Sequence, residues 1–192
     1  MAETKKSKLV LKKKKWHFIT APKILREAEV GQTYISDPAS AINRKLKASM
    51  MQITGEPKTQ NTKIELKITG QHEGKLTTEI IGYELTKTAM KRMIRRGRTK
   101  IHDSIILETE DKKKVRIKPV LVTRNKVLSG TKKELRRKML EYVKETLSKK
   151  KYNELMNDLI NKKFQRTGKD VLRKICPIHI FDVSKIRIIE NK

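Results

Sequence analysis

Apolar and polar residues alternate along several stretches of the chain, the pattern of a β-strand with one buried face. The clearest case is residues 62–69, where every second side chain is apolar. A turn with glycine at both ends, residues 70–74, and a return strand at residues 76–85 complete a predicted hairpin. Along the return strand the apolar phase slips at Gly82, which predicts a β-bulge.

Weaker alternation predicts further strands on both sides of this hairpin. Residues 30–36 and 41–54 are expected to form two strands before it. Residues 100–109 and 115–122 predict a second hairpin after it. Pro119 has no N–H to donate to a neighbouring strand, so it is expected at an edge or at a bulge.

Three other segments have apolar residues at helical spacing. A short helix is predicted at residues 86–97, between a threonine cap and a glycine stop. A longer amphipathic helix is predicted at residues 131–147, and another follows Ser148 as far as Phe164. We expect the last two to form an antiparallel pair that covers the sheet.

The C-terminal part mixes breaks with short elements. Thr167-Gly168 predicts an interruption, residues 169–175 a further turn or two of helix, and Pro177 the start of a last extended segment. Together these patterns predict the α+β class: a curled, mostly antiparallel sheet or barrel-like body with packed helices and a disordered basic N-terminal arm.

The distribution of charge predicts a basic N-terminal arm and an anionic partner. The 192 residues include 48 Lys and Arg against 21 Asp and Glu, a net charge of +27, so an anionic partner is expected. Residues 1–15 contain seven lysines and few apolar side chains, which predicts a flexible arm that orders on phosphates. Residues 16–192 are predicted to be a single α+β RNA-binding domain. Trp16 is expected to pack as its first core residue, with stacking on a base as the alternative.

Composition also excludes several classes of protein. No apolar run approaches the roughly 20 residues that span a bilayer, and the N-terminus has charges where a signal peptide would be apolar. A single cysteine, Cys176, rules out an internal disulfide and suits a reducing compartment. We therefore expect a cytoplasmic protein without membrane attachment.

Catalytic chemistry has little support in the sequence. The chain has no phosphate-binding glycine loop, no nucleophile elbow and no HExxH motif, and its four histidines lack metal-ligand spacing. Asp103 with Glu108, Glu110 and Lys112 resembles the carboxylates and lysine with which some nucleases hold Mg²⁺ beside a phosphate. Such spacing is common in a chain with 36% charged residues. Cys176 is expected to be a buried structural residue. We predict no enzyme, no metal and no cofactor.

The basic residues are the candidate site. Residues 86–100 contain seven basic side chains and no acidic one. Like charges three or four residues apart cost an isolated helix about 0.2–0.5 kcal/mol per pair, which suggests that an anion completes this face. Further basic residues lie in the arm, the entry segment, the turn before residue 115 and the helix at 131–147. The predicted RNA-binding residues are Lys12, Lys13, Lys14, Lys15, Lys23, Arg92, Arg95, Arg96, Arg98, Lys100, Lys113, Arg136 and Arg137.

A series of motifs occurs in a fixed order along nearly the whole chain. They are KKWHFITAPKIL at 14–25, VGQT at 30–33, GYELT at 82–86, RRGRTKI at 95–101, KKELRRKM at 132–139 and PIHIFDVSKIRII at 177–189. With them the chain resembles the small-subunit ribosomal protein family of archaea and eukaryotes called S-three-A, or eukaryote-type S-one. It departs from the family at Leu25, often Phe there, and at Lys87, where the family has Asp.

The resemblance implies a structural protein of the small ribosomal subunit, located on the platform near the messenger exit in the cytoplasmic ribosome. Its implied partners are small-subunit ribosomal RNA and neighbouring small-subunit ribosomal proteins, with messenger RNA as a further candidate. It implies an α+β body and no catalysis. The alternatives are a free-standing basic nucleic-acid-binding protein and a metal-dependent nuclease.

Overall fold

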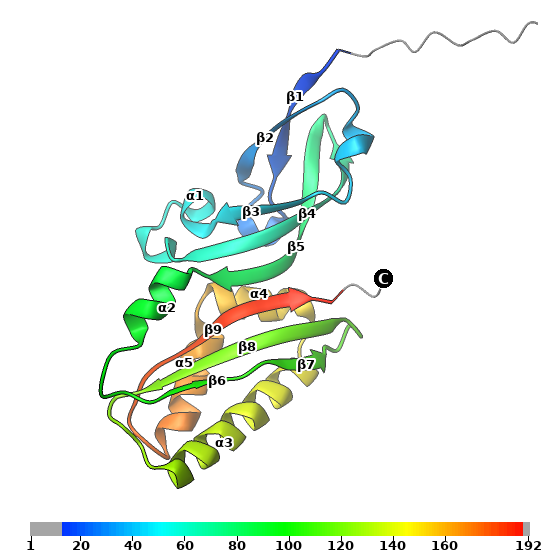
Figure 1. The fold of residues 1–192 in the computed structure, drawn as a ribbon. Helices are drawn as coiled ribbons and strands as arrows, with labels where there is room; N and C mark the ends of the chain where they lie inside the picture. Colours follow the sequence, from blue (N-terminus) through cyan, green and yellow to red (C-terminus); the bar gives the residue numbers. More distant parts are fainter. Residues whose placement is uncertain (1–12, 190–192) are drawn as a thin grey trace, which may run out of the picture.

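The computed structural model describes residues 13–189, so Lys12 and most of the predicted arm lie outside the described residues. Within this range nine strands join in one open sheet of order β2-β1-β5-β9-β8-β6, with β3 and β4 attached through β5, and β7 beside β8 (Figure 1). The strands are β1 (Lys15–Thr20), β2 (Glu29–Ile35), β3 (Lys45–Ser49), β4 (Thr62–His72), β5 (Lys75–Leu85), β6 (Lys100–His102), β7 (Ile105–Glu108), β8 (Lys114–Thr123) and β9 (Ile178–Ile188).

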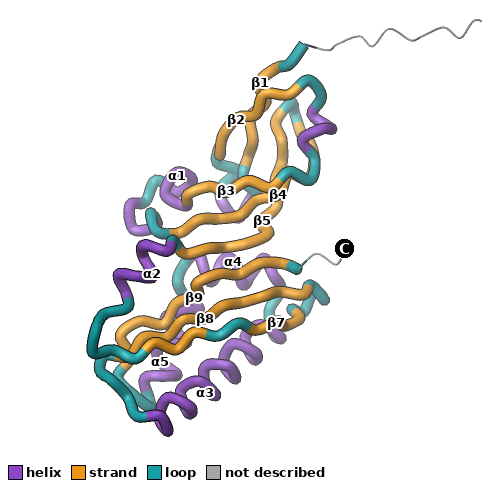
Figure 2. Tube along the Cα trace, in the orientation of Figure 1, coloured by secondary structure: helices purple, strands orange, loops and turns teal. Residues whose placement is uncertain are grey.

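Helices connect the strands and cover one face of part of the sheet. The α-helices are α1 (Met50–Thr54), α2 (Lys87–Met93), α3 (Ser129–Ser148), α4 (Tyr152–Ile160) and α5 (Lys163–Arg173). The 3-10 helices are η1 (Lys23–Leu25), η2 (Pro38–Ala41) and η3 (Pro57–Thr59). Figure 2 shows α3, α4 and α5 on one face of the half formed by β9, β8, β6 and β7. No helix within residues 13–189 is long and apolar enough to cross a bilayer.

The predicted α+β class and mostly antiparallel sheet are confirmed. Only β1 and β5 pair in parallel, through Ile19 and Thr20, and all other strand pairs are antiparallel. The sheet stays open, so of the two predicted shapes the curled sheet is correct and the barrel is not.

The predicted first hairpin is confirmed as β4 and β5. Its register slips between Glu65, opposite Gly82, and Leu66, opposite Ile80, so one residue of β5 has no partner. This is the bulge that the slip in apolar phase predicted. β4 continues to His72, and the turn is shorter than predicted because Gly70 and Gln71 still pair with β5.

The amphipathic helix predicted at residues 131–147 is confirmed as α3. Its buried side chains, at every fourth position, are Leu135, Met139, Val143 and Leu147. They belong to the main core with Ile117 and Leu121 of β8 and Phe181 of β9. Burying each side chain of this size contributes about 1.5–3 kcal/mol, which fixes α3 against the sheet.

The strand predicted at residues 41–54 is wrong at both ends. Only β3 is extended, while Ala41 ends η2 and the last five residues form α1. Met50 is buried and Ile53 packs beside it against the core, which is helical spacing in a segment too short to display a clear period. Gly55 ends α1 in the left-handed conformation with φ +71°.

The break predicted at Thr167-Gly168 is also wrong, because α5 runs through it and the break between α4 and α5 falls at Asn161 and Lys162. Gly168 serves close packing instead. A Cβ placed there would lie 2.7 Å from Tyr142 Cε1 and still closer to the Phe181 ring.

Trp16 does not pack in the core as expected. It lies in β1, which was not predicted, and its side chain is 63% exposed.

Pro119 lies at a bulge, because the register between β8 and β9 shifts at Lys118 and Pro119. This was one of the two positions predicted for it. The strand predicted at residues 100–109 is divided into β6 and β7, both paired with β8.

Candidate nucleic-acid interface

β6 and β9 begin, and β8 ends, at the same end of the sheet (Figure 1). Basic side chains from separate stretches of the chain line hollows at this end. Because Lys100 pairs with Val122 and Ile178 pairs with Thr123, the connectors beyond these strand ends leave the sheet close together. We call this surface the basic end. Its residues are Arg92, Arg95, Arg98, Lys100, Arg124, Lys126, Lys132, Lys169, Arg173 and His179.

Two threonines fix the backbone of the basic end. The fully buried Thr123 hydroxyl accepts a hydrogen bond from the Thr99 N–H at 3.0 Å and donates to the Asn125 carbonyl at 2.6 Å. The Thr99 hydroxyl accepts from the Val127 N–H at 3.0 Å. These bonds tie the connector before β6 to the connector after β8. The basic side chains therefore project from an ordered frame rather than from loose loops.

Three hollows open on the basic end, and no acidic residue lines any of them. One of about 360 Å³ lies between the end of α5 and the start of β9, one of about 550 Å³ between the connector before β6 and the start of α3, and one of about 340 Å³ between α2 and β9. The first turn of α3 carries no acidic residue, so its positive dipole end adds to the field there. Hollows lined by one sign of charge concentrate the opposite ion.

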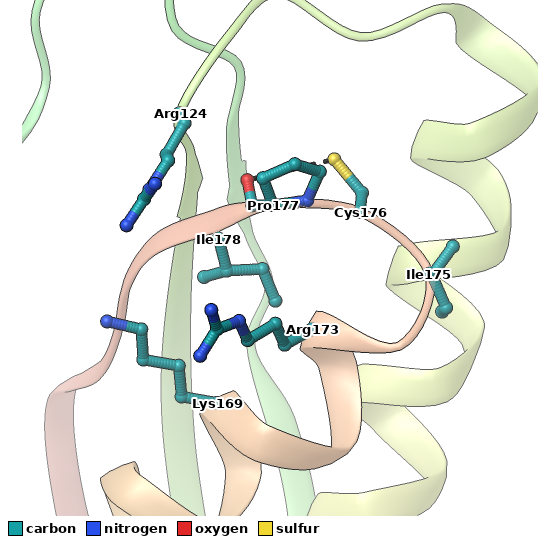
Figure 3. Close-up of a pocket in the computed structure, with 7 residues that line it drawn as sticks. All are labelled: Arg124, Lys169, Arg173, Ile175, Cys176, Pro177 and Ile178. Carbon is teal, nitrogen blue, oxygen red and sulfur yellow. Dashed lines mark hydrogen bonds between the residues drawn. The ribbon is translucent and has the colours of Figure 1, made fainter.

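In the first hollow the charged ends of Arg124, Lys169 and Arg173 point toward the same space (Figure 3). Arg124 follows β8, whereas Lys169 and Arg173 lie one turn apart on α5. Guanidinium groups bind phosphate oxygens in pairs, and an ammonium adds a point charge, so this set has the donors that a phosphate requires.

His179, the second residue of β9, lies among these cations. Burial lowers the pKa of its imidazole, and the positive charges of Arg98, Lys169, Arg124 and Arg95 lower the pKa further. At neutral pH the side chain is therefore uncharged and offers one hydrogen-bond donor and one acceptor. A bound anion would offset the four charges and raise this pKa.

The structure brings four of the predicted RNA-binding residues together at the basic end: Arg92, Arg95, Arg98 and Lys100. Arg92 also donates to the Asn61 side-chain carbonyl at 2.8 Å. Arg96 is exposed in the same connector but lines none of the three hollows.

Other predicted residues lie elsewhere. Lys13, Lys14 and Lys15 are exposed at the start of β1, and Lys23 is exposed in η1. Both positions are in the half of the molecule opposite the start of α3 (Figure 1). Lys12 lies outside the described residues. The structure thus separates these lysines from the basic end.

Three further predicted residues have partners within the chain. Arg136 Nε donates to Asp103 Oδ2 at 2.9 Å, so this guanidinium anchors α3 to the bend between β6 and β7. Lys113 Nζ lies 5.7 Å from the centre of the Tyr152 ring. Arg137 Nε lies 3.8 Å from a carboxylate oxygen one turn along α3.

Sequence reasoning did not find the rest of the basic end: Arg124, Lys126, Lys132, Lys169, Arg173 and His179. In the sequence these residues are scattered over more than 50 positions among many other lysines and arginines. The pairing of β8 with both β6 and β9 brings them together. A basic residue beside a predicted strand end was the only available signal, and it is common in a chain of this charge.

The carboxylates considered for a nuclease do not form a metal site. Asp103 is bound by Arg136, and Glu108 Oε1 lies 3.8 Å from Lys114 Nζ. Within residues 13–189 no group of three His, Cys, Asp or Glu side chains is placed to hold a metal ion. Cys176 is partly exposed rather than buried as predicted, and its Sγ contacts the Pro177 carbonyl at 3.8 Å.

Comparison with known proteins finds relatives that share one name, small ribosomal subunit protein eS1. The chain is 32% identical over 126 residues to small ribosomal subunit protein eS1 of Methanothermobacter thermautotrophicus, an alignment that covers 66% of this chain and 65% of that protein. It is 34% identical over 116 residues to the eS1 protein of Nanoarchaeum equitans, covering 60% and 59%. The eS1 protein of Sulfolobus acidocaldarius is 34% identical over 113 residues, covering 58% and 57%.

The chain therefore spans less than two thirds of the length of these relatives in the aligned region. A sequence model of the whole family extends much further, since it matches residues 2–192. The family is ribosomal and not enzymatic, which leaves the nuclease alternative without support. With a match over essentially its full length, the chain belongs to the Ribosomal S3Ae family.

Proposed function

We propose that the chain is a structural constituent of the small ribosomal subunit that binds ribosomal RNA through the basic end. Its place is the platform near the messenger exit of the cytoplasmic ribosome, beside other small-subunit proteins. Family membership and the names of the relatives support the ribosomal role. The chain has no catalytic task in this proposal.

The observation that carries the proposal is the absence of acidic lining in all three hollows of the basic end. Clustered cations repel one another and remain strongly hydrated unless an anion joins them. RNA supplies phosphates at regular spacing, and their binding releases condensed counterions. The basic end is therefore suited to a polyanion rather than to a small ligand.

The double variant Arg98→Glu with Arg124→Glu tests the proposal, because it reverses charge on two connectors of the basic end. We expect the free energy of unfolding of the isolated variant to stay within about 1 kcal/mol of the parent value, since Arg124 is exposed and Arg98 is only half-buried. We expect its incorporation into small subunits, measured by mass spectrometry of salt-washed particles against a tagged parent chain, to fall at least about tenfold, as loss of two charge-assisted phosphate contacts requires.

The matched control is Lys144→Glu with Lys149→Glu, which makes the same change in net charge at two exposed sites near the opposite end of α3. It should assemble nearly as well as the parent. Equal incorporation of the basic-end variant and this control would show that the anchoring surface lies elsewhere.

A further inference from the structure

The exposed aromatic residues are gathered in one place. All eight aromatic side chains of the chain lie within residues 13–189, and three are exposed: Trp16 at 63%, Tyr34 at 52% and Phe18 at 39%. All three belong to the ribbon of β1 and β2. The other five pack in or against the main core.

The three side chains share one face of the ribbon. β1 and β2 are antiparallel, with Trp16 opposite Tyr34 and Phe18 opposite Gln32, and opposed residues project to the same side. We call Trp16, Phe18, Gln32 and Tyr34 the aromatic face. The Trp16 and Tyr34 ring centres are 5.1 Å apart, with the rings tilted by 43°. The other side of the ribbon, which includes Ile19, packs in a second core cluster.

Charge indicates what covers the aromatic face. Lys13 and Lys14 lie directly before the start of β1 and are exposed, whereas Lys15 projects to the other side of the ribbon opposite Ile35. Exposed apolar surface costs about 25 cal/mol per Å², so three open rings imply an occupant. A partner with flat apolar groups on an anionic backbone matches both the rings and the lysines. Unpaired RNA has this combination, because its bases can leave the stack and lie on aromatic side chains.

We infer that the aromatic face stacks unpaired bases of ribosomal RNA while the adjacent lysines hold the neighbouring phosphates. Trp16 and Phe18 are two residues apart on one strand, about 6.8 Å, so they can receive two successive unstacked bases. The inference rests on the proposed ribosomal function but concerns a second surface, at the end of the molecule opposite the start of α3 (Figure 1).

Trp16 is the only tryptophan of the chain, so its fluorescence reports on this face alone. Titration of the full chain with a ten-nucleotide single-stranded oligo(A) RNA should quench the emission saturably. An RNA duplex of the same length should bind through its phosphates with little quenching. Unchanged emission at saturating oligo(A), with binding confirmed by anisotropy of labelled RNA, would overturn the inference.

Affinity separates stacking from general attraction. We expect Trp16→Ala and Tyr34→Ala each to weaken oligo(A) binding about tenfold, the size of one base-stacking contact, with an unchanged slope of log K against log salt. Ile106→Ala removes an exposed apolar strand residue away from both surfaces and should leave affinity unchanged. Equal affinities for the parent and both aromatic variants would contradict stacking. Far-ultraviolet circular dichroism confirms that the variants are folded.

The RNA source is tested in the particle. A photo-crosslinking phenylalanine analogue at position 18, in small subunits washed free of messenger, should crosslink to ribosomal RNA. Crosslinks only to a protein, or only to messenger added afterwards, would reject ribosomal RNA as the occupant. Failure of the proposed function is a different outcome. It would appear as normal assembly of the Arg98→Glu, Arg124→Glu variant, independently of any change in Trp16 fluorescence.

Discussion

The basic end and a second group of charges, around Glu65, both contain lysine and arginine side chains, but only the second group contains carboxylates. Glu65 is 3% exposed on β4 and lies 3.0 Å from Lys47 Nζ and 3.2 Å from Arg187 Nε. Glu84 of β5 lies 2.9 Å from Lys47 Nζ and 3.5 Å from Lys185 Nζ. We call these five residues the Glu65 cluster. At the basic end no carboxylate lines the hollows.

The difference separates cations that hold the fold from cations that are left for a partner. Only three residue pairs join β5 to β9, so the ion pairs of the Glu65 cluster reinforce a short junction between the two halves of the sheet. The three cations there each have a carboxylate partner within the chain. The cations of the basic end have no such carboxylates in the hollows, and their connectors are held by hydrogen bonds between threonine hydroxyls and backbone groups.

The largest effect is expected from Glu65→Gln. The substitution keeps the shape but removes the buried charge that Lys47, Lys185 and Arg187 share. Breaking a buried ion pair from one side costs about 3 kcal/mol or more, so the urea midpoint should fall markedly at constant m. Glu79→Gln, an exposed position on β5, should change little. A parent-like midpoint for Glu65→Gln would mean that the junction does not depend on this charge.

A smaller loss is expected from Gly82→Ala. A Cβ at Gly82 would lie 2.8 Å from the Ile186 carbonyl oxygen and 3.1 Å from Glu65 Oε2, so it would push β5 away from β9 and from the carboxylate. Overpacking of this kind costs about 2 kcal/mol. Gly31→Ala is the matched control in β2, because nothing lies within 4 Å of its Cβ. Thermal unfolding of both variants measures the contrast, and equal midpoints would contradict this account of the bulge.

The fold was predictable where one-sided burial produces a regular period. The apolar residues of β4 recur at every second position and the buried residues of α3 at every fourth position, so both periods can be recognised in the sequence. β1 was missed because its outer face carries exposed aromatic residues, which resemble core residues in a sequence. Gly168 was misread because a glycine required for close helix packing has the same signature as a helix stop.

The candidate site was predictable only where it is contiguous in sequence. The basic residues between α2 and β6 form a dense run without acids, which indicates an anion partner at once. Arg124 and Arg173 are far apart in sequence and meet through strand pairing and the turn after α5. The ion pair of Arg136 was not predictable either, because its partner Asp103 is 33 positions away and cannot be recognised from local pattern.

The smallest effect, and the finest test of the contrast, concerns His179. The pKa of its imidazole is lowered by burial and by four cations of the basic end. Below about pH 6.5 the unfolded chain therefore binds more protons than the folded chain, and the free protein should lose stability as the pH falls.

Phosphates at the basic end would offset these charges and raise the pKa of His179. RNA binding should therefore take up a proton, and affinity should rise as the pH falls from about 7.5 to about 5.5, a smaller effect than those of the variants above. Anisotropy titrations of labelled duplex RNA across this range measure the effect, which His179→Gln should remove and His72→Gln, at the exposed β4–β5 turn, should retain. Identical pH profiles for the parent and His179→Gln would show that the RNA phosphates do not reach the cations around this imidazole.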